Sequence, residues 1–153
     1  MKCFLKYFKI INRQEGNLEA FKRKLRVMSF EKLIGIDTLW RVSIECENEK
    51  SREEAMELLV DLHLKFDQVV SYEDQVKIWT NFTENCMNNL ESEKDNVISN
   101  TIQLLSRFLD RYEGKKVLKT DIMKSGYSNI QPLQITVLNK NDSLRKAIQV
   151  SYF

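Results

Sequence analysis

An internal repeat constrains the fold of this sequence more than any other feature. Residues 55–66 superimpose without gaps on residues 101–112, an offset of 46 residues. Large apolar side chains coincide at four positions: Leu58 with Leu104, Leu59 with Leu105, Leu62 with Phe108, and Phe66 with Tyr112. Their spacing is typical of one face of an α-helix. Any two amphipathic helices match at core positions, so chance similarity is the alternative, but the long gapless match favours a true repeat.

The length of the repeat indicates its architectural class. Each copy follows a second helical pattern that carries aromatic residues, around Trp40 and around residues 79–82. A period of about 40–47 residues with two or three helices per unit is typical of HEAT and armadillo arrays. One helix pair cannot cover its own apolar face, so it stacks on the next pair. Residues 1–12 match the last helix of a preceding unit, and we therefore expect an excised segment of a longer chain.

The composition agrees with long helices and short connections. The 153 residues include only four Gly and one Pro, and few helix breakers favour helices. We predict a mainly α fold, an armadillo- or HEAT-like α-solenoid segment over residues 1–114. The helices are expected at residues 3–13, 18–28, 38–47, 52–66, 72–92 and 97–113.

Capping residues set the expected ends of these helices. Gly16 and Asn17 stop the first helix. Asp37 is the expected N-cap of the third helix, and Ser51 with Glu54 forms a capping box for the fourth. Asp95 or Asn96 should cap the last helix, which Gly114 should end.

The pattern changes after residue 114. Residues 115–132 mix Gly, Lys, Ser and Asn and end at Pro132, which predicts a linker. Apolar residues then alternate with polar ones, a period of two that is typical of strands. We therefore predict a C-terminal β-hairpin over residues 133–153, with a turn at residues 140–143.

Charge and hydropathy exclude several function classes. The formal net charge is +2, from 24 basic and 22 acidic side chains, whereas nucleic-acid binders usually carry a large basic excess. One basic cluster stands out, and a solvated helix face is favoured for it over a site for phosphate or an acidic partner: Lys22, Arg23, Lys24 and Arg26. Because no stretch of 18 apolar residues occurs, we expect no membrane span.

The candidates for chemistry are few. Cys3, Cys46 and Cys86 form no disulfide or zinc pattern, which favours a reducing compartment. Each lies in an apolar-periodic stretch and is interpreted as a small buried hydrophobe rather than a nucleophile. His63, the only histidine, is expected on the helix surface or half-buried. Trp40 and Trp79 are interpreted as core anchors rather than a ligand cage. We expect no catalytic, cofactor or metal site, and the partner-binding residues are unknown.

Several segments resemble a known family. Residues 33–42 (LIGIDTLWRV), 54–59 (EAMELL) and 82–91 (FTENCMNNLE) are similar to the helical region of the giant ubiquitin-specific proteases of the fat facets type. In that family the helices lead into a ubiquitin-like domain, and residues 133–137 and 147–152 look like its first two strands. The catalytic Cys and His boxes of the peptidase are absent. The resemblance therefore implies a scaffold or partner-recruiting region of a deubiquitinase rather than a hydrolase.

The sequence thus predicts a protein-interaction segment of a large cytoplasmic deubiquitinase. Its partners are expected to be proteins, not nucleic acid or membrane, and its apolar ends also allow a homo-oligomer. A generic armadillo- or HEAT-type adaptor unrelated to ubiquitin is the first alternative, and a small stand-alone enzyme is the second.

Overall fold

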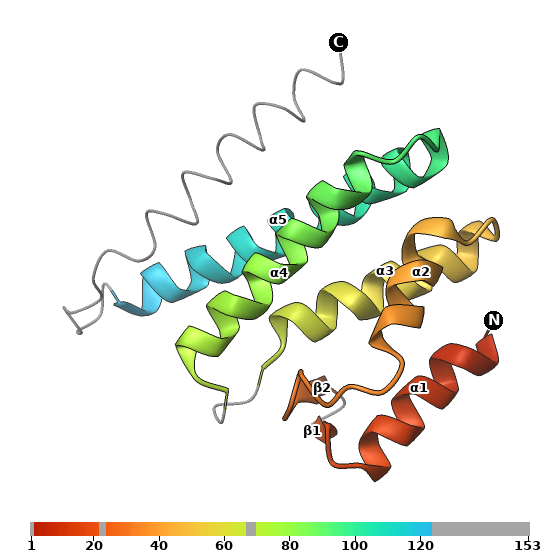
Figure 1. Cartoon of the computed structure of the whole chain (residues 1–153). Helices are drawn as coiled ribbons and strands as arrows, with labels where there is room; N and C mark the ends of the chain where they lie inside the picture. Colours follow the sequence, from red (N-terminus) through yellow and green to blue (C-terminus); the bar gives the residue numbers. More distant parts are fainter. Residues whose placement is uncertain (1, 22–23, 67–69, 124–153) are drawn as a thin grey trace. The chain divides into compact units, whose positions relative to one another are not determined.

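The computed structural model describes residues 2–21, 24–66 and 70–123, and within them the chain is mainly α, as predicted (Figure 1). Contacts divide the chain into one unit, Met1–Arg111, and a second, Tyr112–Phe153. The elements, in chain order, are α1 (Lys2–Gln14), β1 (Leu18–Phe21), β2 (Lys24–Val27), α2 (Ile36–Glu45), α3 (Glu49–Leu64), α4 (Tyr72–Leu90) and α5 (Asp95–Met123).

Helix α3 lies at the centre of the first unit. The stripe predicted from the repeat is buried, with Leu58 at 5% and Leu62 at 0% exposure. Met56, Val60 and Leu64, which lie outside that stripe, are buried as well. A helix that is apolar on most of its circumference has to be covered from several sides. Helix α2 packs closely along α3, and α4 and β2 also contact it.

The two repeated helices are parallel neighbours, as the repeat predicts. Polar contacts join Gln103 to Glu53 at 3.0 Å and Arg111 to Asp61 at 2.9 Å. Because the partners on α3 and α5 advance along their helices together, the helices run in the same direction. Leu104 and Phe108 of the second copy are 0% and 2% exposed, which confirms their predicted place in the core.

The helix predicted over residues 18–28 is wrong, because residues 18–21 and 24–27 form a pair of β-strands, called the hairpin below. Strands β1 and β2 pair antiparallel, with Leu18 opposite Val27. The Asn17 carbonyl oxygen accepts a hydrogen bond from the Met28 amide at 2.9 Å, and the Val27 amide donates to the Lys65 carbonyl at 2.9 Å. Strand β2 therefore satisfies the Lys65 carbonyl at the end of α3 with an amide that a helix would use in its own hydrogen bonds. These tertiary contacts override a weak local helix preference.

Two helix starts also differ from the predictions. Helix α2 begins at Ile36, after Gly35 in the left-handed conformation (φ 82°), and Asp37 lies in its first turn rather than at its cap. Helix α3 is capped by Asn48, whose side chain accepts a hydrogen bond from the Ser51 amide at 2.9 Å. Asn caps as well as Ser does, so the helix starts a turn earlier than the Ser51 capping box predicted.

The predicted end of α1 is confirmed. Gly16 has a φ of 72°, a conformation that favours glycine. The Asn17 amide donates to the Asn12 carbonyl at 2.8 Å, and the Gly16 amide donates to the Arg13 carbonyl at 3.1 Å. This pair of bonds is the Schellman motif.

The predicted end of α5 at Gly114 is wrong, because the helix continues to Met123. A single Gly costs a helix interior only about 1 kcal/mol, and the Lys and Leu residues that follow it are good helix formers. Residues 115–123 of the predicted linker are therefore helical. The rest of that linker and the predicted C-terminal hairpin lie outside the described residues.

The buried repeat generates a stability prediction. Leu104→Ala should lower the free energy of unfolding by about 2–5 kcal/mol, because the removed methyl groups leave a cavity in a packed core. Met87→Ala is a matched control, since Met87 is 43% exposed and its truncation should change stability by at most about 0.5 kcal/mol. Urea unfolding followed by circular dichroism measures both, and equal losses would place Leu104 outside the core.

Candidate interaction surface

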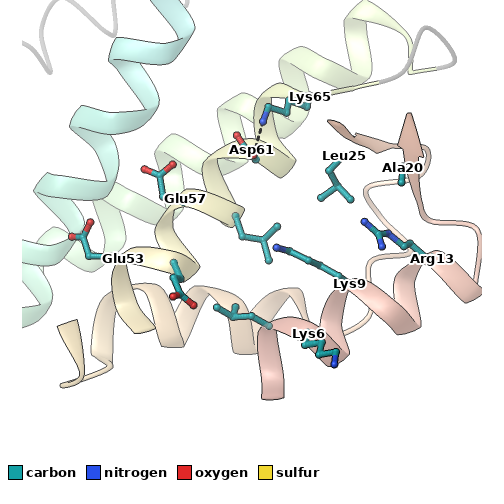
Figure 2. Close-up of a pocket in the computed structure, with 12 residues that line it drawn as sticks. Lys6, Lys9, Arg13, Ala20, Leu25, Glu53, Glu57, Asp61 and Lys65 are labelled. Atoms are coloured by element: carbon teal, nitrogen blue, oxygen red, sulfur yellow. Dashed lines mark hydrogen bonds and ion pairs between the residues drawn. The ribbon is translucent and has the colours of Figure 1, made fainter. Parts of the chain in front are cut away.

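A groove of about 760 Å³ opens between α1, the β-hairpin and α3 (Figure 2). Four apolar residues line it, namely Leu5, Ala20, Leu25 and Leu58. Leu5 and Leu58 are 7% and 5% exposed, so the groove lies directly over the core. Its size is within the range of about 300–1,000 Å³ that is common for ligand sites.

The two helical walls of the groove carry opposite charge. Lys6, Lys9 and Arg13 come from α1, at a spacing that puts them on one face. The facing wall is acidic and belongs to α3, with Glu53, Glu54, Glu57 and Asp61. The Lys65 ammonium lies at the end of this wall, 2.5 Å from the Asp61 carboxylate. The sequence pattern does not reveal this surface, because its two walls are brought together by strands β1 and β2, which connect the end of α1 to the end of α3.

The acidic wall of α3 is shared with α5 through a ladder of ion pairs. The Arg107 guanidinium contacts the carboxylates of Glu53 and Glu57, the latter at 3.0 Å. The Arg111 guanidinium contacts Glu57 and also Asp61, the latter at 2.9 Å. Each arginine thus bridges two acidic side chains, and Glu57 joins the two arginines.

Asp61 and Arg107 occupy equivalent positions in the two copies of the 46-residue repeat, so the repeat predicts an ion pair between them. The observed ladder differs from this prediction. Arg107 instead reaches residues one and two turns earlier, and Arg111 reaches Asp61. Side chains on a helix lean toward its N-terminus, and Arg is longer than Asp or Glu. An arginine therefore meets an acceptor one turn before the residue beside its own Cα.

His63 is fully buried, contrary to the predicted surface or half-buried position. Its side chain is 2% exposed, and its ring contacts Phe30, Trp40 and Phe82 at centroid distances of 4.6, 5.8 and 4.7 Å. The ring Nδ1 lies 2.7 Å from the Leu59 carbonyl oxygen and donates to it in the neutral ring. Burial lowers the pKa of His63 from 6.5 to about 4.

The three cysteines lie in different environments. Cys86 is buried as predicted, and burial raises the pKa of its thiol. Cys46 is half-buried and Cys3 is exposed, so the prediction of a buried position is wrong for Cys3. A raised pKa disfavours the thiolate, the reactive form of cysteine. Among the described residues, no group of three or more His, Cys, Asp or Glu side chains could hold a metal ion.

The tryptophans and the basic cluster complete the predicted candidates. Trp40 and Trp79 are half-buried anchors, and the Trp79 indole donates to the His63 carbonyl at 2.7 Å. Lys24 and Arg26 lie on strand β2 instead of the expected helix face, and Lys22 and Arg23 lie outside the described residues.

No helix in the described ranges has the length and apolar character needed to cross a bilayer.

The ion-pair ladder can be tested by a double-mutant cycle. Arg107→Met with Glu57→Gln should show a coupling energy of about 0.5–1 kcal/mol, because the pair is partly exposed but belongs to a network. Added salt should reduce the coupling. The matched cycle of Arg107→Met with Asp61→Asn should show a smaller coupling, because Asp61 is linked to Arg107 only through Arg111 and Glu57, and the reverse ranking would support the 46-residue register.

The buried His63 generates a pH prediction. Its pKa in the folded chain is about 4, against 6.5 when exposed, so the unfolded chain takes up the proton first as pH falls. Stability present above pH 6.5 should therefore be lost between pH 6.5 and 4, at about 1.4 kcal/mol per pH unit and about 3 kcal/mol in total. His63→Phe should remove this component. Urea unfolding of both proteins from pH 7 to 4 measures it, and parallel pH profiles would contradict it.

Comparison with known proteins gives related sequences for about two thirds of the chain. It is 36% identical over 110 residues to ubiquitin carboxyl-terminal hydrolase 9Y of Mus musculus, which is 65% of this chain and 4% of that protein. It is 37% identical over 101 residues to ubiquitin carboxyl-terminal hydrolase 9X of Mus musculus and to the 9Y protein of Homo sapiens, 62% of this chain and 4% of each relative. No model of a known protein family matches the chain.

The chain thus spans about 4% of the length of these relatives. The similarity agrees with the resemblance stated above from residues 33–42, 54–59 and 82–91. Over 101–110 residues this chain is thus similar to one short segment of these ubiquitin carboxyl-terminal hydrolases.

Proposed function

We propose that this chain is a non-catalytic segment of a large deubiquitinase that recruits or positions protein partners. The similarity to a short part of three ubiquitin carboxyl-terminal hydrolases carries this proposal. It favours a place in the ubiquitin system over a generic adaptor.

The environments of the reactive side chains support a role without catalysis. A cysteine hydrolase needs a thiolate within hydrogen-bond reach of a histidine. His63 is enclosed by aromatic rings and uses its Nδ1 on the Leu59 carbonyl. Within the described part of the chain, the Cys46 thiol approaches the Asn48 carbonyl, at 3.8 Å, and none of the three thiols bonds to His63. A scaffold role is consistent with these positions.

The proposal includes protein partners and a cytoplasmic location. The net charge of +2 is small for a nucleic-acid binder. Free cysteines are compatible with a reducing compartment. Stacked helices present extended surfaces to which proteins bind.

The first test is hydrolysis of a ubiquitin–fluorophore by this chain. We expect no turnover above the buffer blank, and Cys3→Ser and Cys46→Ser should behave as the unchanged chain does. Turnover that depends on either cysteine would overturn the proposal in favour of a stand-alone enzyme.

The second test uses mouse ubiquitin carboxyl-terminal hydrolase 9X from which the segment matching this chain has been removed. Cleavage of the small ubiquitin–fluorophore should be unchanged, because no recruitment is needed for it. Cleavage of intact ubiquitinated proteins should show a raised KM, and grafting this chain into the gap should restore it. Loss of fluorophore cleavage would show that the segment serves catalysis itself.

A further inference from the structure

The groove between α1 and α3 contains cations without partners. Lys6, Lys9 and Arg13 follow each other at i, i+3 and i+7 along α1, and all three line the groove. No ion pair or side-chain hydrogen bond holds any of them within residues 2–21, 24–66 and 70–123. Lys9 and Arg13 extend from α1 into the groove, whereas Lys6 lies at its rim (Figure 2).

On the opposite wall of the groove, most carboxylates of α3 already have ion-pair partners and are not available to these cations. Glu53, Glu57 and Asp61 are already engaged by Arg107 and Arg111. In contrast, Glu54 is exposed and has no ion pair with any residue that the structure describes. The unpaired charges along the groove are therefore three cations on the α1 side and one carboxylate on the α3 side.

An apolar floor separates the two edges. Leu25 is half-buried and Ala20 is exposed, both on the hairpin at one end of the groove. Leu5 and Leu58 lie beneath, between the helices. A volume of about 760 Å³ admits a few side chains but no folded domain, so a matching ligand is a single protein segment with an apolar centre.

We propose that this groove docks an amphipathic protein segment in one orientation. Acidic side chains of the segment would pair with Lys6, Lys9 and Arg13, its apolar side chains would cover the floor, and a basic or neutral edge would face Glu54. Like charges placed opposite each other cost affinity, so the acidic α3 wall disfavours a uniform polyanion such as nucleic acid. The inference rests on the proposed role as an interaction segment and names the chemistry of the partner.

The probe is a synthetic fluorescent peptide of about 14 residues, a length at which helices are marginal in water and gain order on binding. It carries Glu along one edge, Leu along the centre and Lys along the other edge. A scrambled peptide of the same composition is the control, and a single-stranded oligonucleotide tests the polyanion alternative. Fluorescence anisotropy with the whole chain should show binding of the patterned peptide alone, and it should weaken with salt.

Variants of the groove identify the contact. Lys9→Glu with Arg13→Glu should weaken binding at least about tenfold, the loss of 1.4 kcal/mol or more. Lys50→Glu with Lys94→Glu makes the same change of net charge at exposed positions outside the groove and should have no effect. Glu54→Lys should strengthen binding of a peptide whose second edge is neutral, a gain that unfolding cannot mimic. Ala20→Trp should block the groove.

Several results would overturn the inference. These are equal binding of the scrambled peptide, equal losses in the groove and control variants, tighter binding of the oligonucleotide, or sedimentation showing that a second copy of the chain covers the groove. None of these results bears on the deletion experiment in the hydrolase, which compares cleavage of the ubiquitin–fluorophore with the KM for intact ubiquitinated proteins. Failure here therefore removes the assigned partner chemistry and leaves the proposed scaffold role to its own test.

Discussion

The first unit depends on the burial of α3. Its sixteen residues include eight that are buried, and one of these is His63. Such a helix cannot remain exposed on any broad face, since each buried Leu or Val side chain contributes about 1.5–3 kcal/mol relative to exposure. Helix α2 covers one side, and α4, α5 and the hairpin cover others. The exposed surfaces of these elements, including the groove, follow from how they are arranged around α3.

The apolar repeat was enough to predict that α3 and α5 are parallel neighbours, but it could not supply their register. Leu58 and Leu104 fall in the core for any small shift along the helices, because a helix repeats its apolar face every three or four residues. The polar contacts decide between these shifts. Arg107 bridges Glu53 and Glu57, which depends on side-chain length and direction, properties that an apolar pattern does not contain.

The apolar periodicity predicted α1 and α4 to within two residues at each end, whereas the hairpin required distant partners. Gly16 ends α1 through its own neighbours, and Ser71 caps α4 by accepting from the Asp74 amide at 3.1 Å. Val27 instead bonds to Lys65, 38 positions along the chain. The interaction groove was missed for the same reason: its walls are close in space only because the hairpin joins the end of α1 to the end of α3.

The same burial bears on function. In the aromatic cluster burial lowers the pKa of His63, and Cys86 is enclosed in the core, so these two side chains contribute to packing, whereas Cys46 is half-buried and Cys3 is exposed. Because His63 and Cys86 are buried, the proposed binding of a protein segment would depend on charged side chains at the surface. On α3 the carboxylates are largely satisfied by α5, while Lys9 and Arg13 of α1 extend into the groove without partners among the described residues. The docking proposed above would use this combination of a buried centre, which fixes the geometry, and an edge whose charges have no partners among the described residues.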